Sequence, residues 1–235
     1  MASETMASKK RLSSDERRAL ITEAAIAVFG AKGYVGTTTD DVARAADISQ
    51  PYVVRLFGTK EQLFLAAFDE TLRLLFEAFE RAAGAGVDDE IEARMGHEYV
   101  GLLRVRGLHQ TLSHAFLLGA HPVIGPRARD GFARVWQYVR DLGLSTDRAQ
   151  EFLAQGMLIN TMIGLRVADE SEGDPRISDL FAACFPRDKA TVLALAPRAD
   201  VVALLTPTVE EWLRHRLGDL APVTVVGPNP LPLGY

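Results

Sequence analysis

The feature that most constrains the fold is the helical spacing of apolar residues, which continues through nearly the whole chain. Between Leu20 and Phe29 apolar residues recur at intervals of three and four, as they do on the buried face of an amphipathic helix. This first helix is predicted from Ser13 to Gly33. No segment alternates polar and apolar residues between hairpin turn signals, so the sequence predicts an all-α fold without a sheet.

The composition suits a globular protein, because 235 residues, 48% hydrophobic and 24% charged, can bury one large core or two smaller ones. No uninterrupted apolar run approaches the roughly 18 to 20 residues that cross a bilayer, and residues 1–12 lack the apolar centre of a signal peptide. The single cysteine, Cys184, excludes an internal disulfide. We expect a cytoplasmic protein without membrane attachment.

The charges are unevenly divided along the chain, whose net charge is −5. The first 60 residues hold nine Lys and Arg against seven acidic residues, whereas the remainder holds 17 against 24. A small basic module joined to a larger acidic one is typical of a protein that binds a polyanion through one part only. Chance clustering of solvated charges is the alternative that charge alone leaves open.

Two short helical patterns follow the first helix. Thr38 or Thr39 can cap a helix over residues 40–46, Asp47 interrupts the pattern, and Ser49 can cap a second short helix. Two short helices joined by a turn of three or four residues form the helix-turn-helix layout. This layout also occurs in proteins that never bind DNA, so a helical scaffold that binds only protein partners remains an alternative.

The residue types around these two helices suit duplex DNA. Hydroxyls and amides at a helix N-terminus can hold a phosphate, and side chains at the start of the second helix can reach base edges in the major groove. Flanking cations can hold the DNA backbone. The predicted DNA-binding residues are Thr37, Thr38, Thr39, Ser49, Gln50, Pro51, Tyr52, Arg55 and Lys60.

The stretch RRALITEAAIAVFGAKGYVGTTTDDVARAADISQPYVVRLFGTKEQLF, residues 17–64, resembles the DNA-binding domain of TetR-family transcriptional regulators. The positions that carry the resemblance are Ala25, Phe29, Gly33, Tyr34, Thr37, Thr38, Val42, Ala43, Ala46, Ser49, Phe57, Lys60, Glu61 and Leu63. Two residues depart from the family's pattern. Asp47 stands where the family usually has a glycine in the turn, and Val54 stands where it usually has a tyrosine that touches a phosphate. Tyr52, two positions earlier, can supply a different contact, and Gln50, Pro51 and Tyr52 form the expected reading edge of the module. The resemblance implies a dimeric repressor that a small-molecule effector releases from a palindromic operator.

The predicted domains follow from these patterns. Residues 1–12 form a disordered basic arm, 13–58 the helix-turn-helix DNA-binding domain, 59–220 a larger helical regulatory and dimerisation domain, and 221–235 an extended tail with four prolines. Beyond the DNA-binding domain, helices are predicted at 59–83, 88–106, 108–119, 122–142, 146–170, 175–185 and 207–217. The structure of 186–205 is left open.

A homodimer is predicted from the helix at 146–170, because its apolar residues surround it and its own core can cover only part of them. Small residues at intervals of four permit a second helix to approach closely, and the helix at 207–217 can complete a four-helix interface. The predicted interface residues are Gly156, Asn160, Gly164, Val209, Trp212 and Leu213. The central helix of a monomeric bundle is the alternative.

A small-molecule effector, if there is one, should bind inside the acidic helical domain. Candidate lining residues place aromatic, sulfur or polar atoms on otherwise apolar helix faces. They are Met95, Tyr99, His114, Phe116, Trp136, Met157 and Asn160. Each of them is also an ordinary core residue in the alternative interpretation.

No catalytic residue, metal or cofactor is predicted. The five histidines show no metal-ligand spacing, Cys184 has no CxxC partner, and no phosphate loop or nucleophile elbow occurs. An all-α metal-dependent enzyme is a further alternative, and the metal content of the purified protein discriminates it.

Overall fold

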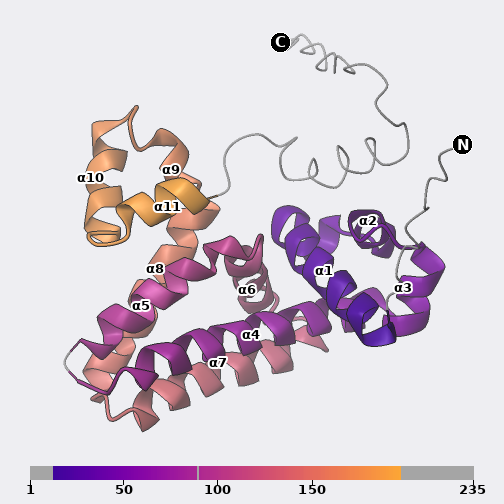
Figure 1. Ribbon diagram of the computed structural model, residues 1–235, viewed down its shortest axis with the longest axis horizontal. Helices are drawn as coiled ribbons and strands as arrows, with labels where there is room; N and C mark the ends of the chain where they lie inside the picture. The colour runs from indigo at the N-terminus through magenta and orange to yellow at the C-terminus, as the bar shows by residue number, and fades with distance from the viewer. Residues whose placement is uncertain (1–12, 89, 197–235) are drawn as a thin grey trace, which may run out of the picture.

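The computed structural model describes residues 13–88 and 90–196 (Figure 1). Over these residues the chain forms eleven α-helices and one 3₁₀ helix and contains no strand, which confirms the all-α prediction. Three of the predicted segments lie outside the described residues. They are the basic arm, the helix at 207–217 with Val209, Trp212 and Leu213, and the tail at 221–235.

The first helix, α1 (Ser14–Gly36), begins with a capping box, in which the side chains of Ser13 and Glu16 bind each other's backbone amides. It does not end at Gly33 as predicted. Gly33 has a φ of 69°, so the backbone kinks there and helical turns resume up to Gly36. The kink carries the chain from α1 directly to the start of the next helix.

Two short helices, α2 (Thr39–Ala45) and α3 (Gln50–Phe57), pack with α1 around a shared core. Asp47 makes the turn between them with a φ of 52°, a left-handed conformation that Asp can adopt at modest cost. Helices of seven and eight residues are marginal alone, so their orientation depends on this core. The core residues include Ile21, Phe29, Val42, Val53 and Phe57.

The longest helix, α4 (Lys60–Gly84), begins beside α3 and leads into the rest of the molecule. It lies alongside α7 (Ile124–Asp141), and the two form the lower layer in Figure 1. Above them lie α5 (Ile91–Gly101) and α6 (Leu108–Leu117). The helix predicted at 88–106 is shorter than expected, because α5 gives way to the 3₁₀ helix η1 (Leu102–Arg104).

The backbone of α6 contacts the backbone of α1 with no side chain between them. A Cβ atom on Gly30 would lie 2.6 Å from the Cα of Gly107, and one on Gly107 would lie 2.5 Å from the carbonyl oxygen of Ile26. Beside this contact the buried Thr111 hydroxyl donates to the same Ile26 oxygen at 3.0 Å. Helices α1 to α3 are thereby joined to the larger helical part at a second place besides α4.

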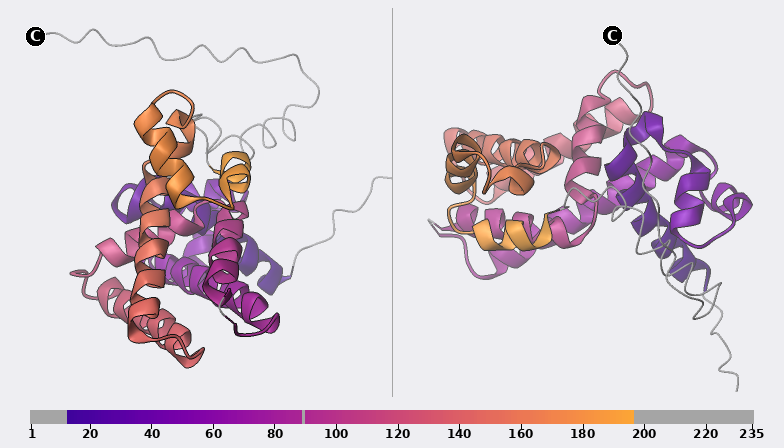
Figure 2. Two further views of the ribbon diagram at one scale, coloured as in Figure 1. Left: turned by 90° about the vertical axis from the view of Figure 1, so that its left-hand side faces the viewer. Right: turned by 90° about the horizontal axis from the view of Figure 1, so that it is seen from above.

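Helix α8 (Thr146–Gly164) is followed by α9 (Val167–Glu170), α10 (Pro175–Cys184) and α11 (Lys189–Leu195). The predicted continuous helix at 146–170 is wrong, because Arg166 adopts a left-handed φ of 56° and separates α8 from α9. Figure 2 shows α9 to α11 gathered near one end of α8, at the opposite end of the molecule from α2 and α3.

Among the described helices, α1 alone is long and apolar enough to cross a membrane. Core helices of globular proteins meet the same criterion, and α1 packs against α2, α4 and α6. Its composition is therefore explained by its place in the core.

Candidate functional site

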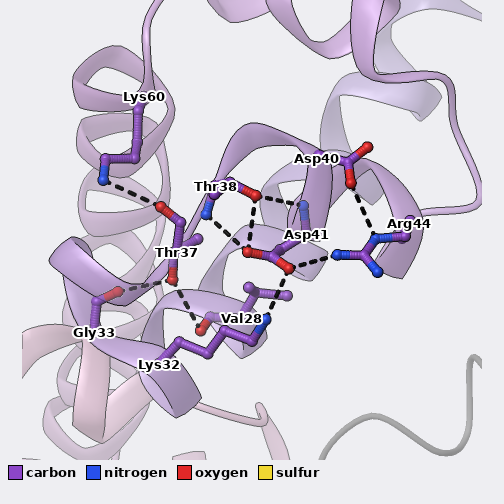
Figure 3. Close-up of polar contacts among 9 residues, drawn as sticks. All are labelled: Val28, Lys32, Gly33, Thr37, Thr38, Asp40, Asp41, Arg44 and Lys60. Carbon is purple, nitrogen blue, oxygen red and sulfur yellow. Dashed lines mark hydrogen bonds and ion pairs between the residues drawn. The ribbon is translucent and has the colours of Figure 1, made fainter.

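A network of polar contacts holds the start of α2 (Figure 3). Thr38 caps the helix by accepting from the amide of Asp41, whose carboxylate in turn accepts from the amide of Thr38 at 2.9 Å. The same carboxylate binds Lys32 of α1 and Arg44 of α2, each at 2.7 Å. Burial raises the pKa of Asp41, but the hydrogen bonds from Lys32 and Thr38 outweigh it and lower that pKa to about 2. The position of α2 against α1 is thus set by one carboxylate.

Thr37 and Lys60 join the kinked end of α1 to α4. The Thr37 side chain is fully buried, and its hydroxyl donates to the carbonyl oxygen of Gly33 at 2.7 Å. The Lys60 ammonium donates to the carbonyl oxygens of Tyr34 and Thr37 at 3.0 and 3.1 Å and lies 4.5 Å from the centre of the Tyr34 ring. Contrary to the expectation from sequence, the Thr37 hydroxyl faces the interior, and the Lys60 ammonium is already bound within the protein.

The N-termini of α2 and α3 come together at one surface. The Gln50 amide donates to the Thr39 hydroxyl at 3.2 Å, which links two of the predicted DNA-binding residues across the turn. Ser49 is the N-cap of α3, but its side chain makes no capping hydrogen bond, and both Ser49 and Pro51 are exposed. These side chains are available to an external partner.

Tyr52 lies between two arginines. The guanidinium of Arg55, one turn further along α3, is 4.5 Å from the centre of its ring, and that of Arg17 on α1 is 5.4 Å from it. Arg17 also donates to the Tyr52 hydroxyl at 3.4 Å. The hydrogen bond from Arg17 lowers the pKa of Tyr52, and Arg55 acts in the same direction. Sequence reasoning did not select Arg17, because a contact across 35 positions leaves no local pattern.

In the larger domain, an apolar groove of about 440 Å³ lies among α6, α7 and α8. Phe116, Trp136 and Met157, three of the predicted ligand residues, line it together with Phe132. A smaller cavity of about 50 Å³ shares Phe116, Phe132 and Met157 with the groove. The two spaces therefore lie side by side and share part of their walls.

The smaller cavity is lined by two residues with polar groups, Tyr99 and Asn160. The Tyr99 hydroxyl donates to the Asn160 side-chain oxygen at 2.5 Å, and both residues line the cavity. Behind them, the buried His109 donates from Nε2 to the carbonyl oxygen of Tyr99 at 3.1 Å, since a carbonyl can only accept. Burial lowers the pKa of His109 to about 4, so this group is neutral near pH 7.

Two of the predicted ligand residues lie away from both spaces. Met95 is fully buried in the core, and His114 contacts the kink of α1, with its Cε1 3.5 Å from where a Cβ on Gly33 would lie. Neither lines the groove or the smaller cavity. The sulfur of Met95 and the ring of His114 are thus explained by packing within the protein.

The predicted small-residue stripe of α8 divides into an exposed and a buried part. A Cβ on Gly156 or Gly164 would meet no described atom within 4 Å outside the helix's own backbone. Asn160 is buried and bound to Tyr99, so it faces the interior and departs from the predicted interface. Leu158 and Leu165, by contrast, are 39% and 69% exposed.

No group of three or more His, Cys, Asp or Glu side chains with the geometry of a metal site occurs within 13–88 or 90–196.

Residues 21–67, from α1 into α4, match the family described as bacterial regulatory proteins, tetR family. The N-terminal domain of this chain therefore matches the tetR family, and the match supports a DNA-binding transcriptional regulator. The matched segment contains the complete α2–turn–α3 unit. Among curated proteins none matches this chain significantly in sequence.

Solved structures resemble this chain over most of its length. The multidrug binding protein EbrR, crystallised with imidazole, is 19% identical, with 84% of this chain and 100% of that chain covered and a TM-score of 0.47. A TetR-family transcriptional regulator from Mesorhizobium loti MAFF303099, described as putative, is 20% identical, with 87% and 98% covered and a TM-score of 0.40. Likenesses at this level add nothing to the assignment made from the N-terminal domain.

Proposed function

We propose that this regulator is a homodimeric repressor that binds a palindromic operator and leaves it when a small molecule occupies the larger domain. In this proposal residues 13–58 bind the DNA, residues 59–220 dimerise and bind the effector, and the protein acts in the cytoplasm. The residues that face the DNA are Thr38, Thr39, Ser49, Gln50 and Pro51, and those beside them are Tyr52, Arg55 and Lys60.

The observation that carries the proposal is the surface formed by the N-termini of α2 and α3. It presents the linked Thr39 and Gln50 side chains and the exposed Ser49 and Pro51 on a helix that the core holds in place. Side chains in this position of a helix-turn-helix reach base edges in the major groove. A twofold dimer presents two such helices, so the half-site centres should lie about one helical turn, roughly 34 to 36 Å, apart.

The effector proposal rests on the groove and the cavity behind it. Their aromatic lining suits a flat apolar ring, and a volume of about 440 Å³ is within the range of small-molecule sites. Among the described residues that line the two spaces, Arg129 is charged and no carboxylate occurs. We therefore assign the effector to aromatic compounds that are neutral or anionic, since a cation would find no counter-charge there.

Binding to the DNA upstream of the protein's own gene tests the first half of the proposal. Fluorescence anisotropy should show tight binding to one segment and weaker binding to a random duplex, and footprinting should show a protected site with dyad symmetry. A protein scaffold without DNA affinity predicts no binding to either duplex at physiological salt. A footprint without dyad symmetry contradicts the dimeric arrangement.

Trp136 provides the test of the effector site, because it lines the groove. In a Trp212→Phe background, its fluorescence should respond to 1-naphthoate or 1-naphthamide and less to the cationic 1-naphthylmethylamine. The compounds that change the fluorescence should also weaken operator binding. A fluorescence response without any change in DNA affinity leaves a binding site but removes the sensing role.

A further inference from the structure

The cations of the DNA-binding helices are not equivalent, because most of them are bound within the protein. Lys32 and Arg44 pair with the Asp41 carboxylate. Arg18 donates to the carbonyl oxygen of Leu56 at 3.3 Å, where it caps the end of α3. The Lys60 ammonium is bound by two carbonyl oxygens, as described above.

Among the described residues, the side chains of Arg17 and Arg55 bind neither a carboxylate, as Lys32 and Arg44 do, nor a backbone carbonyl oxygen, as Arg18 and Lys60 do. Within the described part of the chain, neither has an ion pair with a carboxylate. Both instead contact Tyr52, at ring-centre distances of 5.4 and 4.5 Å, and the bond from Arg17 reaches the phenol oxygen. Two positive groups therefore converge on one aromatic side chain without an anion between them.

This arrangement is electrostatically incomplete. Like charges held near one ring repel each other, and the attraction of each guanidinium to the ring face offsets that repulsion only in part. A guanidinium has five N–H donors in a planar fork, and one bond to a phenol leaves most of them free. An anion with several acceptor oxygens would satisfy both groups at once, and phosphate has this geometry.

The position of the pair identifies the source of the phosphate. Tyr52 and Arg55 lie on α3, whose N-terminus carries the proposed reading residues, and Arg17 lies on the first turn of α1. Val54, exposed to 38% on the same helix, has no hydrogen-bonding group to offer. A cationic site beside a reading helix faces the DNA backbone that flanks the bases being read.

We propose that Arg17 and Arg55, held in place by Tyr52, form a clamp for a single backbone phosphate of DNA, with Tyr52 as the positioning residue. This inference rests on the proposed DNA-binding function and makes it more specific. Tyr52 contributes affinity for any duplex and does not select the base sequence. Arg17, on α1, then fixes the angle at which α3 enters the groove.

The salt dependence of binding to a labelled random 30-bp duplex tests the clamp. The slope of log Kobs against log salt concentration falls by about 1 for each phosphate contact that is lost. If both arginines of each subunit hold one phosphate, the dimer loses two contacts, so the double variant Arg17→Gln/Arg55→Gln should lose about 2 in slope. The two single variants should not add up to it in affinity. Two separate contacts in each subunit would give a loss of about 4, and no contact would give none. Either result overturns the clamp.

Arg134→Gln is the matched control, since Arg134 also lies over an aromatic ring, 5.1 Å from the centre of Phe76, but on α7. It changes the net charge equally and should leave the slope unchanged. Tyr52→Phe keeps the ring and should bind nearly as the wild type, whereas Tyr52→Ala should lose affinity equally on random duplex and on the upstream segment. Loss confined to the upstream segment would make Tyr52 a base-reading residue and overturn its positioning role.

Helix content and melting temperature should be measured for every variant, so that lost binding is not confused with lost folding. If the wild type binds no duplex at any salt concentration, the proposed function fails and the clamp fails with it. If the wild type binds with a steep slope that the double variant retains, the clamp alone fails.

Discussion

Replacing Asp41 by Asn should remove the charge that joins α1 to α2. The pKa of this carboxyl lies at about 2 in the folded protein against 3.8 for the free group. At about 1.4 kcal/mol per pH unit, the difference corresponds to about 2 kcal/mol of folding free energy at pH 7. The side chain is only 11% exposed, so solvent screening reduces this value little. Asp41→Asn should therefore lower the free energy of unfolding by about 2 kcal/mol.

The pH dependence of this loss in stability shows whether it comes from the charge of Asp41 or from the shape of its side chain. Because the folded pKa is the lower one, the contribution is complete above pH 4 and is lost as the pH falls through about 2. The difference between wild type and Asp41→Asn in urea unfolding, followed by circular dichroism, should thus decrease to about 1 kcal/mol at pH 3.

The neighbouring Asp40 supplies a matched control for this experiment. Its side chain is 61% exposed and it pairs with Arg44 at 3.2 Å. Asp40→Asn should therefore cost less than about 1 kcal/mol. Equal losses for the two variants, or a loss for Asp41→Asn that is the same at pH 7 and pH 3, would refute the reasoning.

Three further predictions follow from other contacts. Gly156→Leu with Gly164→Leu should reduce the mass in light scattering from dimer to monomer, because a Cβ at either position meets no described atom within 4 Å and the larger side chain would clash with a partner helix. An unchanged mass contradicts the interface. Lys60→Ala should lower the free energy of unfolding by about 1 to 3 kcal/mol, since two carbonyl oxygens lose their charged donor. Unchanged stability with a salt slope reduced by about 2 for the dimer would instead make Lys60 a phosphate contact. His109 has a pKa of about 4 when folded and near 6.5 when unfolded, so stability should fall as the pH drops from 6.5 to 4, and His109→Gln should flatten that part of the unfolding profile.

The sequence predicted the elements whose signals are local. The helix starts predicted at 13, 59 and 175 and the interruption predicted at Asp47 each depend on residues within a few positions of one another. The break between α8 and α9 was missed, because Arg166 carries neither the glycine nor the proline that marks such a break.

The candidate site was predictable only in part, and for the same reason. The N-terminal residues of α3 follow from the helix-turn-helix spacing, whereas the bonds of Lys60 cross 23 and 26 positions and depend on the packing of α1 against α4. Likewise, the helical period of α8 could not separate Asn160, which faces inward, from the glycines four positions to either side.

The contact between Gly30 and Gly107 has a mechanical consequence. Most helix pairs touch through side chains, which change rotamer and absorb a small displacement before the neighbouring backbone moves. At Gly30 and Gly107 the two backbones are in direct contact, and the Thr111 hydroxyl donates a hydrogen bond to the same turn of α1. No side chain lies between them that could absorb a displacement by changing its rotamer. Helix α6, one wall of the aromatic groove, is therefore in direct backbone contact with α1, the helix that carries Arg17, and no rotamer change separates the two.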